Sequence, residues 1–340
     1  MIARIQKRPQ WQRVIIFAAL VAAVIVVIFI ITLGVGYIGV NAGPRNQSIA
    51  MQDTLTVREW AILPGDDAYP AALTIDPDGN VYTGSYVNGA IWRITPDGVV
   101  TELPRTRDSF GAVTGLVWAD DGLYVLDRKN ALGEAGMRVW RWREDTTATL
   151  YNEDTSNRFP YDLARDAQGN LYISAIVIGN ESEIMRLTPQ LEMSVWWKAP
   201  KKTSITGLAY QAATDTILAV DTNASDIYAI PAATPADSTL LYHNVVNPAP
   251  QLDGLIAAAD GTVYVAALGL NRVAALSPTL DLTYLAGAFR GSSRVAYDAT
   301  RRRLYVNNWD QRSLLADQML FVKIDVTPKL PFALDVIEWK

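Results

Sequence analysis

Carboxylates recur at two places in a phrase that this 340-residue chain repeats. Asp162 and Asp253 stand at the start of the first apolar stretch of their copies, whereas Asp127 and Asp221 end the second stretch of theirs. Carboxylate oxygens are the ligands that Ca²⁺ and other hard cations prefer. Because the last copy holds an arginine and an asparagine at these two places, the candidate site residues are Asp127, Asp162, Asp221, Asp253, Arg294 and Asn307.

The repeated phrase is an apolar strand, a tight turn, a second apolar strand that carries tyrosine, and a third strand. Its six copies begin 43, 47, 45, 47 and 40 residues apart, which is the length of a four-stranded propeller blade. Alternating apolar residues suit half-buried strands, and pairs such as Asp78-Gly79 suit hairpin turns. The sequence predicts an all-β, six-bladed propeller with first strands that begin near Leu73, Leu116, Leu163, Leu208, Leu255 and Val295.

Two segments at the ends of the repeated region are predicted to belong to the last blade. Residues 332–339 are predicted as its fourth, outermost strand. Residues 55–63 form one more predicted strand, which adds to the same blade and helps to fasten the ring.

The propeller topology predicts where the candidate site lies. The first strand of a blade is innermost and antiparallel to the second, so the start of one and the end of the other lie at the same face. We therefore expect the four carboxylates and Arg294 to converge on the mouth of the central channel, with Asp162, Asp221 and Asp253 as ligands of Ca²⁺ or another divalent cation. A second interpretation stays open, because an aspartate at a strand end often bonds a turn or pairs with a neighbouring blade.

The N-terminal region is predicted to cross a membrane once. Residues 14–33 contain a single polar residue, Thr32, and the apolar character continues to Val40. Because the basic residues Arg4, Lys7, Arg8 and Arg13 precede this stretch, we expect a cytoplasmic N-terminus and an extracytoplasmic propeller at the cell membrane. The predicted organisation is a cytoplasmic segment 1–13, a transmembrane helix 14–40 in contact with lipid, a linker 41–54 and the propeller 55–340. A cleaved signal peptide is the alternative.

Composition excludes several classes of function. The net charge of −5 and the lack of a basic field argue against a nucleic-acid partner. The chain has no cysteine, so disulfides and thiolate metal sites are excluded. The single histidine, His243, is expected on an outermost strand, far from the axis where a Ser-His-Asp triad would need it.

Four first-strand phrases resemble those of a known superfamily: Val113-Thr114-Gly115-Leu116, Tyr161-Asp162-Leu163-Ala164, Ile205-Thr206-Gly207-Leu208 and Leu252-Asp253-Gly254-Leu255. They are similar to the regucalcin/gluconolactonase and strictosidine-synthase-like propellers, which are in turn similar to NHL-repeat propellers. In the lactonases of this group, Glu, Asn and Asp hold a divalent cation, and another Asn contacts the substrate. The resemblance places these four positions on Ala71, Thr206, Asp253 and Tyr161 in this chain, so only the Asp is kept.

Two functions of different class follow from these features. One is a membrane-tethered binding or scaffold module with a degenerate lactonase-type site, which presents loops to a protein partner, to subunits of a membrane complex or to a small ligand. The other is a metal-dependent lactone or ester hydrolase that works at the channel mouth. Long connections at residues 128–136, 177–183 and 308–318 are the candidates for a binding edge. For the last of them, an apolar cover over the edge of its own blade is the alternative.

Overall fold

The computed structural model describes residues 9–41, 48–65, 67–130, 135–144, 148–177, 181–200, 202–310, 314 and 331–340. The chain forms two compact units, of which one contains helix α2 (Gln10–Asn41) and the other contains the propeller. Within the described residues, α2 is the one helix that is long and apolar enough to span a membrane, a requirement that an N-terminal signal sequence also meets.

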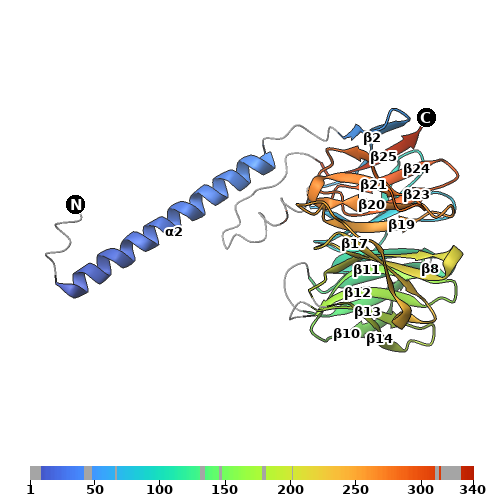
Figure 1. Ribbon diagram of the computed structural model, residues 1–340, viewed down its shortest axis with the longest axis horizontal. Helices are drawn as coiled ribbons and strands as arrows, with labels where there is room; N and C mark the ends of the chain where they lie inside the picture. Colours follow the sequence, from blue (N-terminus) through green and yellow to red (C-terminus); the bar gives the residue numbers. More distant parts are fainter. Residues whose placement is uncertain are drawn as a thin grey trace. The chain divides into compact units, whose positions relative to one another are not determined.

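Six antiparallel sheets form the propeller, as the sequence predicts, and Figure 1 labels many of their strands. The innermost strands are β3 (Pro70–Ile75), β7 (Ala112–Ala119), β11 (Arg158–Arg165), β15 (Ile205–Gln211), β19 (Leu252–Ala257) and β23 (Val295–Asp298). The second strands are β4 (Val81–Ser85), β8 (Gly122–Arg128), β12 (Leu171–Val177), β16 (Thr216–Asp221), β20 (Val263–Ala267) and β24 (Arg303–Asn307).

The outer strands complete the sheets. The third strands are β5 (Ile91–Ile94), β9 (Met137–Trp142), β13 (Glu181–Leu187), β17 (Asp226–Pro231), β21 (Arg272–Leu276) and β25 (Ala333–Trp339). The fourth strands are β6 (Val100–Glu102), β10 (Thr149–Asp154), β14 (Met193–Lys198), β18 (Thr239–Tyr242), β22 (Leu282–Gly287) and β2 (Leu55–Ile62). A short fifth strand, β1 (Ile49–Ala50), pairs with β22 at the outer edge of blade five.

The closure of the ring confirms one prediction and corrects another. Strand β2 joins blade six, as expected, and lies beside β25 (Figure 1). However, the prediction that residues 332–339 form the outermost strand is wrong, because β25 is third and β2 is fourth. Glu338 lies between two cations, with its carboxylate 3.3 Å from Arg58 Nε on β2 and 2.8 Å from Arg303 Nε on β24. Blade six is thus built from both ends of the propeller sequence.

Apolar side chains between neighbouring sheets form the core. Val113, Leu116 and Val125 of blade two pack with Ile91 of blade one. Comparable clusters fill the four interfaces from blade two round to blade six. The period-2 pattern of the strands produces this arrangement, since successive side chains point to opposite faces of a sheet and both faces of a blade are covered by its neighbours. The propeller therefore presents its innermost strands on a rigid scaffold.

Candidate functional site

Each of the first five blades carries a β-bulge near the start of its innermost strand. In blade two, for example, Val113 pairs with Asp127 and Gly115 pairs with Leu126, so Thr114 has no partner. A bulge bends the strand and changes the direction of the extra side chain. The residues at the five bulges are Ala71, Thr114, Tyr161, Thr206, and Asp253 with Gly254.

All of these bulged residues except Gly254 line a pocket of about 140 Å³ at one end of the central channel, and Arg294 contributes from blade six. Three aromatic side chains, Tyr86, Tyr161 and Trp309, line it as well. The rings of Tyr86 and Trp309 meet edge to face with centroids 5.4 Å apart. The pocket therefore combines apolar surface with a few convergent polar groups, as small-molecule sites do.

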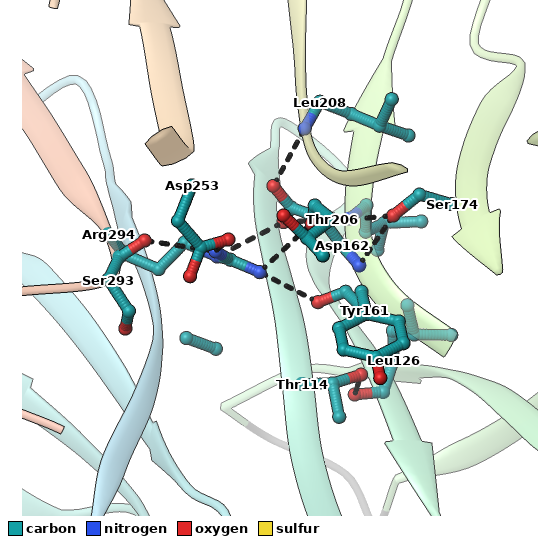
Figure 2. Close-up of polar contacts among 12 residues, drawn as sticks. Thr114, Leu126, Tyr161, Asp162, Ser174, Thr206, Leu208, Asp253, Ser293 and Arg294 are labelled. Atoms are coloured by element: carbon teal, nitrogen blue, oxygen red, sulfur yellow. Dashed lines mark hydrogen bonds and ion pairs between the residues drawn. The ribbon is translucent and has the colours of Figure 1, made fainter. Parts of the chain in front are cut away.

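The guanidinium of Arg294 lies between Asp253 and Asp162 (Figure 2). Its Nη1 donates to Asp253 Oδ1 at 2.8 Å and to the carbonyl of Ser293 at 2.9 Å. Its Nη2 donates to the carbonyls of Tyr161 at 2.9 Å and Thr206 at 3.2 Å. One side chain thus connects blades three, four, five and six at the axis.

Electrostatics hold this arginine in its charged form. Arg294 is only 7% exposed, and burial disfavours its charge, but the carboxylates of Asp162 and Asp253 outweigh burial and raise the pKa of Arg294. Burial raises the pKa of Asp162 to about 6, against the lowering effects of Arg294 and of two backbone N–H groups, and Asp162 is therefore mainly ionised at neutral pH.

Asp162 belongs to the wall of the channel below the mouth. Its Oδ1 accepts the N–H of Leu163 at 2.9 Å, and its Oδ2 accepts the N–H of Leu208 at 2.9 Å. The bulge in blade three places Tyr161, rather than Asp162, in the ring of residues at the mouth. A second cavity, of about 220 Å³, lies further along the first strands and is lined by both Asp162 and Arg294. The Arg294 network therefore separates the two cavities.

Asp127 is engaged within blade two. It forms an ion pair with Arg138, and its Oδ1 accepts the indole N–H of Trp140 at 2.9 Å. Its Oδ2 accepts the N–H of Gly111, which precedes the first strand, at 2.6 Å. All of these contacts stabilise the blade.

Asp221 and Asn307 have corresponding roles in their blades. Asp221 Oδ1 accepts the N–H of Ser204 at 2.9 Å. Asn307 Oδ1 accepts the N–H groups of Ser293 and Arg294 at 3.0 and 2.7 Å. Side chains at second-strand ends thus fasten the loops that lead into the first strands, and Asn307 in this way positions Arg294.

The residues at the mouth do not fit a divalent metal centre. Of the three predicted ligands, Asp162 and Asp253 are joined by a guanidinium, and Asp221 binds the backbone. Across the described ranges, no group of three or more His, Cys, Asp or Glu side chains is close enough to hold a metal ion. A hard cation needs several converging oxygen ligands, and here the positive charge comes from Arg294.

His243 lies on the outside of blade four. Its side chain is 65% exposed, and its Nδ1 is 3.1 Å from Asp226 Oδ1. The predicted contact loops are only partly visible: residues 131–134, 178–180, 311–313 and 315–318 lie outside the described residues. Trp309, from the third of these loops, lines the pocket.

Fold and site together define a six-bladed propeller protein with an axial pocket formed by bulged residues of the inner strands. Residues 105–308, more than half of the chain, match the model of the SMP-30/gluconolactonase/LRE-like region. The chain belongs to this family.

Solved structures show the same fold at low sequence identity. Virginiamycin B lyase from Staphylococcus aureus is 14% identical and has a TM-score of 0.58, with 84% of this chain and 100% of that chain covered. A putative gluconolactonase is 16% identical, with a TM-score of 0.60 and coverage of 87% and 97%. The calcium-binding protein regucalcin from Agrobacterium tumefaciens is 14% identical, with a TM-score of 0.59 and coverage of 83% and 96%. No curated protein matches the chain significantly.

Proposed function

We propose that this protein is a membrane-tethered binding module for a small ligand, which its axial pocket receives, or for a protein partner. One observation carries the proposal: the guanidinium of Arg294 occupies the place beside Asp253, and all four of its Nη hydrogens already have acceptors. Such a group stabilises the mouth of the channel but offers neither a Lewis acid nor an activated water.

The enzyme activities named for related proteins would need chemical groups that this pocket lacks. For a lactonase of the gluconolactonase type, the family positions for the metal-binding Glu and Asn hold Ala71 and Thr206. A histidine-to-alanine variant of the Staphylococcus aureus virginiamycin B lyase is described as catalytically inactive. The only histidine of this chain, His243, lies on the outside of blade four and pairs with Asp226. Binding without turnover is the function that the pocket supports best.

Turnover assays with the full-length protein in a neutral detergent test this proposal. We expect no hydrolysis of aldonolactones with Ca²⁺, Zn²⁺ or a chelator, because one carboxylate holds a divalent cation weakly. We also expect no Ca²⁺-dependent rise in melting temperature. Calcium-dependent lactone turnover that Asp253→Ala abolishes, while Asp78→Ala in an exposed hairpin turn leaves it intact, would establish the hydrolase instead.

The tether is part of the proposal. Helix α2 has the length of a membrane span, and basic residues such as Arg8 and Arg13 precede its apolar part. We expect protease added to intact cells to digest the propeller, and an epitope tag at the N-terminus to be protected. A propeller that becomes accessible only in inverted vesicles would reverse the orientation, and a mature chain without residues 1–40 would identify a cleaved signal sequence.

A further inference from the structure

Two carboxylates meet the single guanidinium of Arg294, whereas a further cation, Arg128, lies on the Tyr86 side of the pocket. Asp162 and Asp253 face one guanidinium, so the cluster has a net charge of −1 when both are ionised. Asp253 is only 5% exposed. Its Oδ1 accepts from Arg294, and no described residue donates to its Oδ2. Since Asp253 lines the pocket, this oxygen is available to a ligand that brings positive charge or a hydrogen-bond donor.

The polar groups beside Asp253 are mostly engaged as donors already. The hydroxyls of Thr206 and Thr222 bond to each other, and Thr114 Oγ1 donates to the carbonyl of Leu126 at 3.4 Å. What these groups still offer to a ligand is mainly the lone pairs of oxygen. The wall of the pocket near Asp253 is therefore rich in acceptors.

Aromatic rings form much of the remaining wall. Tyr86, Tyr161 and Trp309 line the pocket together with Asp253. The face of an aromatic ring attracts a cation, and this attraction is strongest when the cation is shielded from water. Arg128 donates to the Tyr86 hydroxyl at 2.9 Å, so a ligand cation is expected at Asp253 rather than at that hydroxyl.

We infer that the pocket binds a small organic ammonium ion, with its positive charge at Asp253 Oδ2 and its alkyl groups against the aromatic rings. This inference rests on the proposed function of the pocket as a ligand site. The volume of about 140 Å³ is enough for several water molecules and therefore leaves room for a trimethylammonium headgroup. A divalent metal is disfavoured at the same place because it needs more oxygen ligands than one carboxylate supplies.

Calorimetric titration of the full-length protein, in a neutral detergent and an amine-free phosphate buffer, tests the inference. The probes are choline and 3,3-dimethylbutan-1-ol, which has the same shape without the charge. We expect choline to bind at least about tenfold more tightly than the alcohol. Equal affinities, or no binding of choline at millimolar concentration, would overturn the assignment.

Three variants locate the site. Asp253→Asn keeps an acceptor for Arg294 but removes the charge, so choline should bind about tenfold more weakly while the alcohol is unaffected. Trp309→Phe keeps an aromatic face, whereas Trp309→Leu removes it, so only the second should weaken choline binding. Circular dichroism first shows that each variant is folded at the temperature of the titration. Unchanged choline affinity in both Asp253→Asn and Trp309→Leu would contradict the inference.

Failure of this inference is distinguishable from failure of the proposed function. If choline and the alcohol bind alike, the ammonium assignment fails and the pocket remains a binding site. If metal-dependent lactone turnover is found, the binding-module function fails whatever the titrations show.

Discussion

Replacing Arg294 by methionine should lower the free energy of unfolding by about 3–5 kcal/mol, because the change leaves Asp162 and Asp253 buried without a counter-charge. The carbonyls of Tyr161 and Thr206 would also lose their donor. Urea unfolding followed by tryptophan fluorescence measures the loss.

An exposed arginine with two acidic partners is the matched control. Arg107 pairs with Glu102 and Asp67 but is about 40% exposed, so Arg107→Met should cost at most about 1 kcal/mol. Neutralising the carboxylates should also recover stability: Arg294→Met should cost less in an Asp162→Asn, Asp253→Asn background. A loss at Arg294 no larger than that at Arg107 would show that the axial network does not stabilise the ring.

Gly207→Val should disrupt the propeller more than any exposed substitution, and Gly207→Ala should cost about 1–3 kcal/mol. A Cβ at this position would lie 2.3 Å from the backbone carbonyl oxygen of Asp253 and 2.9 Å from its carbon. The obstacle is the backbone of the next blade, which has no alternative rotamer to adopt. Thermal unfolding monitored by circular dichroism gives the effect.

Gly287 provides the comparison, because a Cβ there would first meet the flexible side chain of Arg272, at 3.2 Å. Gly287→Ala should therefore be close to neutral. Equal melting temperatures for Gly207→Ala and the wild type would mean that the inner strands are less closely packed than the structure indicates. Since Thr206 and Asp253 flank this contact, Gly207→Ala should also weaken ligand binding in the pocket.

The repeat made the fold predictable because each copy contains its own turn and strand signals. Asp78-Gly79, for instance, marks the first hairpin of blade one, and Gly79 indeed has a φ of 88°. The pairing order in blade six was not predictable in the same way, because nothing local in residues 55–63 or 332–339 shows which strand lies outside the other.

The sequence predicted which residues lie at one face of the propeller, because the strand topology determines this. It did not predict the contacts that these residues make. Spacing alone could not show that blade three contributes Tyr161 to the mouth, since a bulge shifts the register by one residue. Nor could it show that Arg294 reaches across the axis to the carbonyl of Tyr161. The glycine in phrases such as Thr206-Gly207 was the available signal, because it marks the close approach that accompanies the bulge.

The position of β2 has a consequence for the synthesis of this protein. Arg58 and its partner Glu338 are 280 residues apart, so β2 emerges from the ribosome long before its partner strand exists. At typical elongation rates the delay is roughly 15–60 s. An unpaired apolar strand invites association with other chains during this interval, and charges on the strand oppose it. We therefore expect Arg58 and Glu59, at the centre of β2, to oppose aggregation of the nascent chain before they become part of the closed ring.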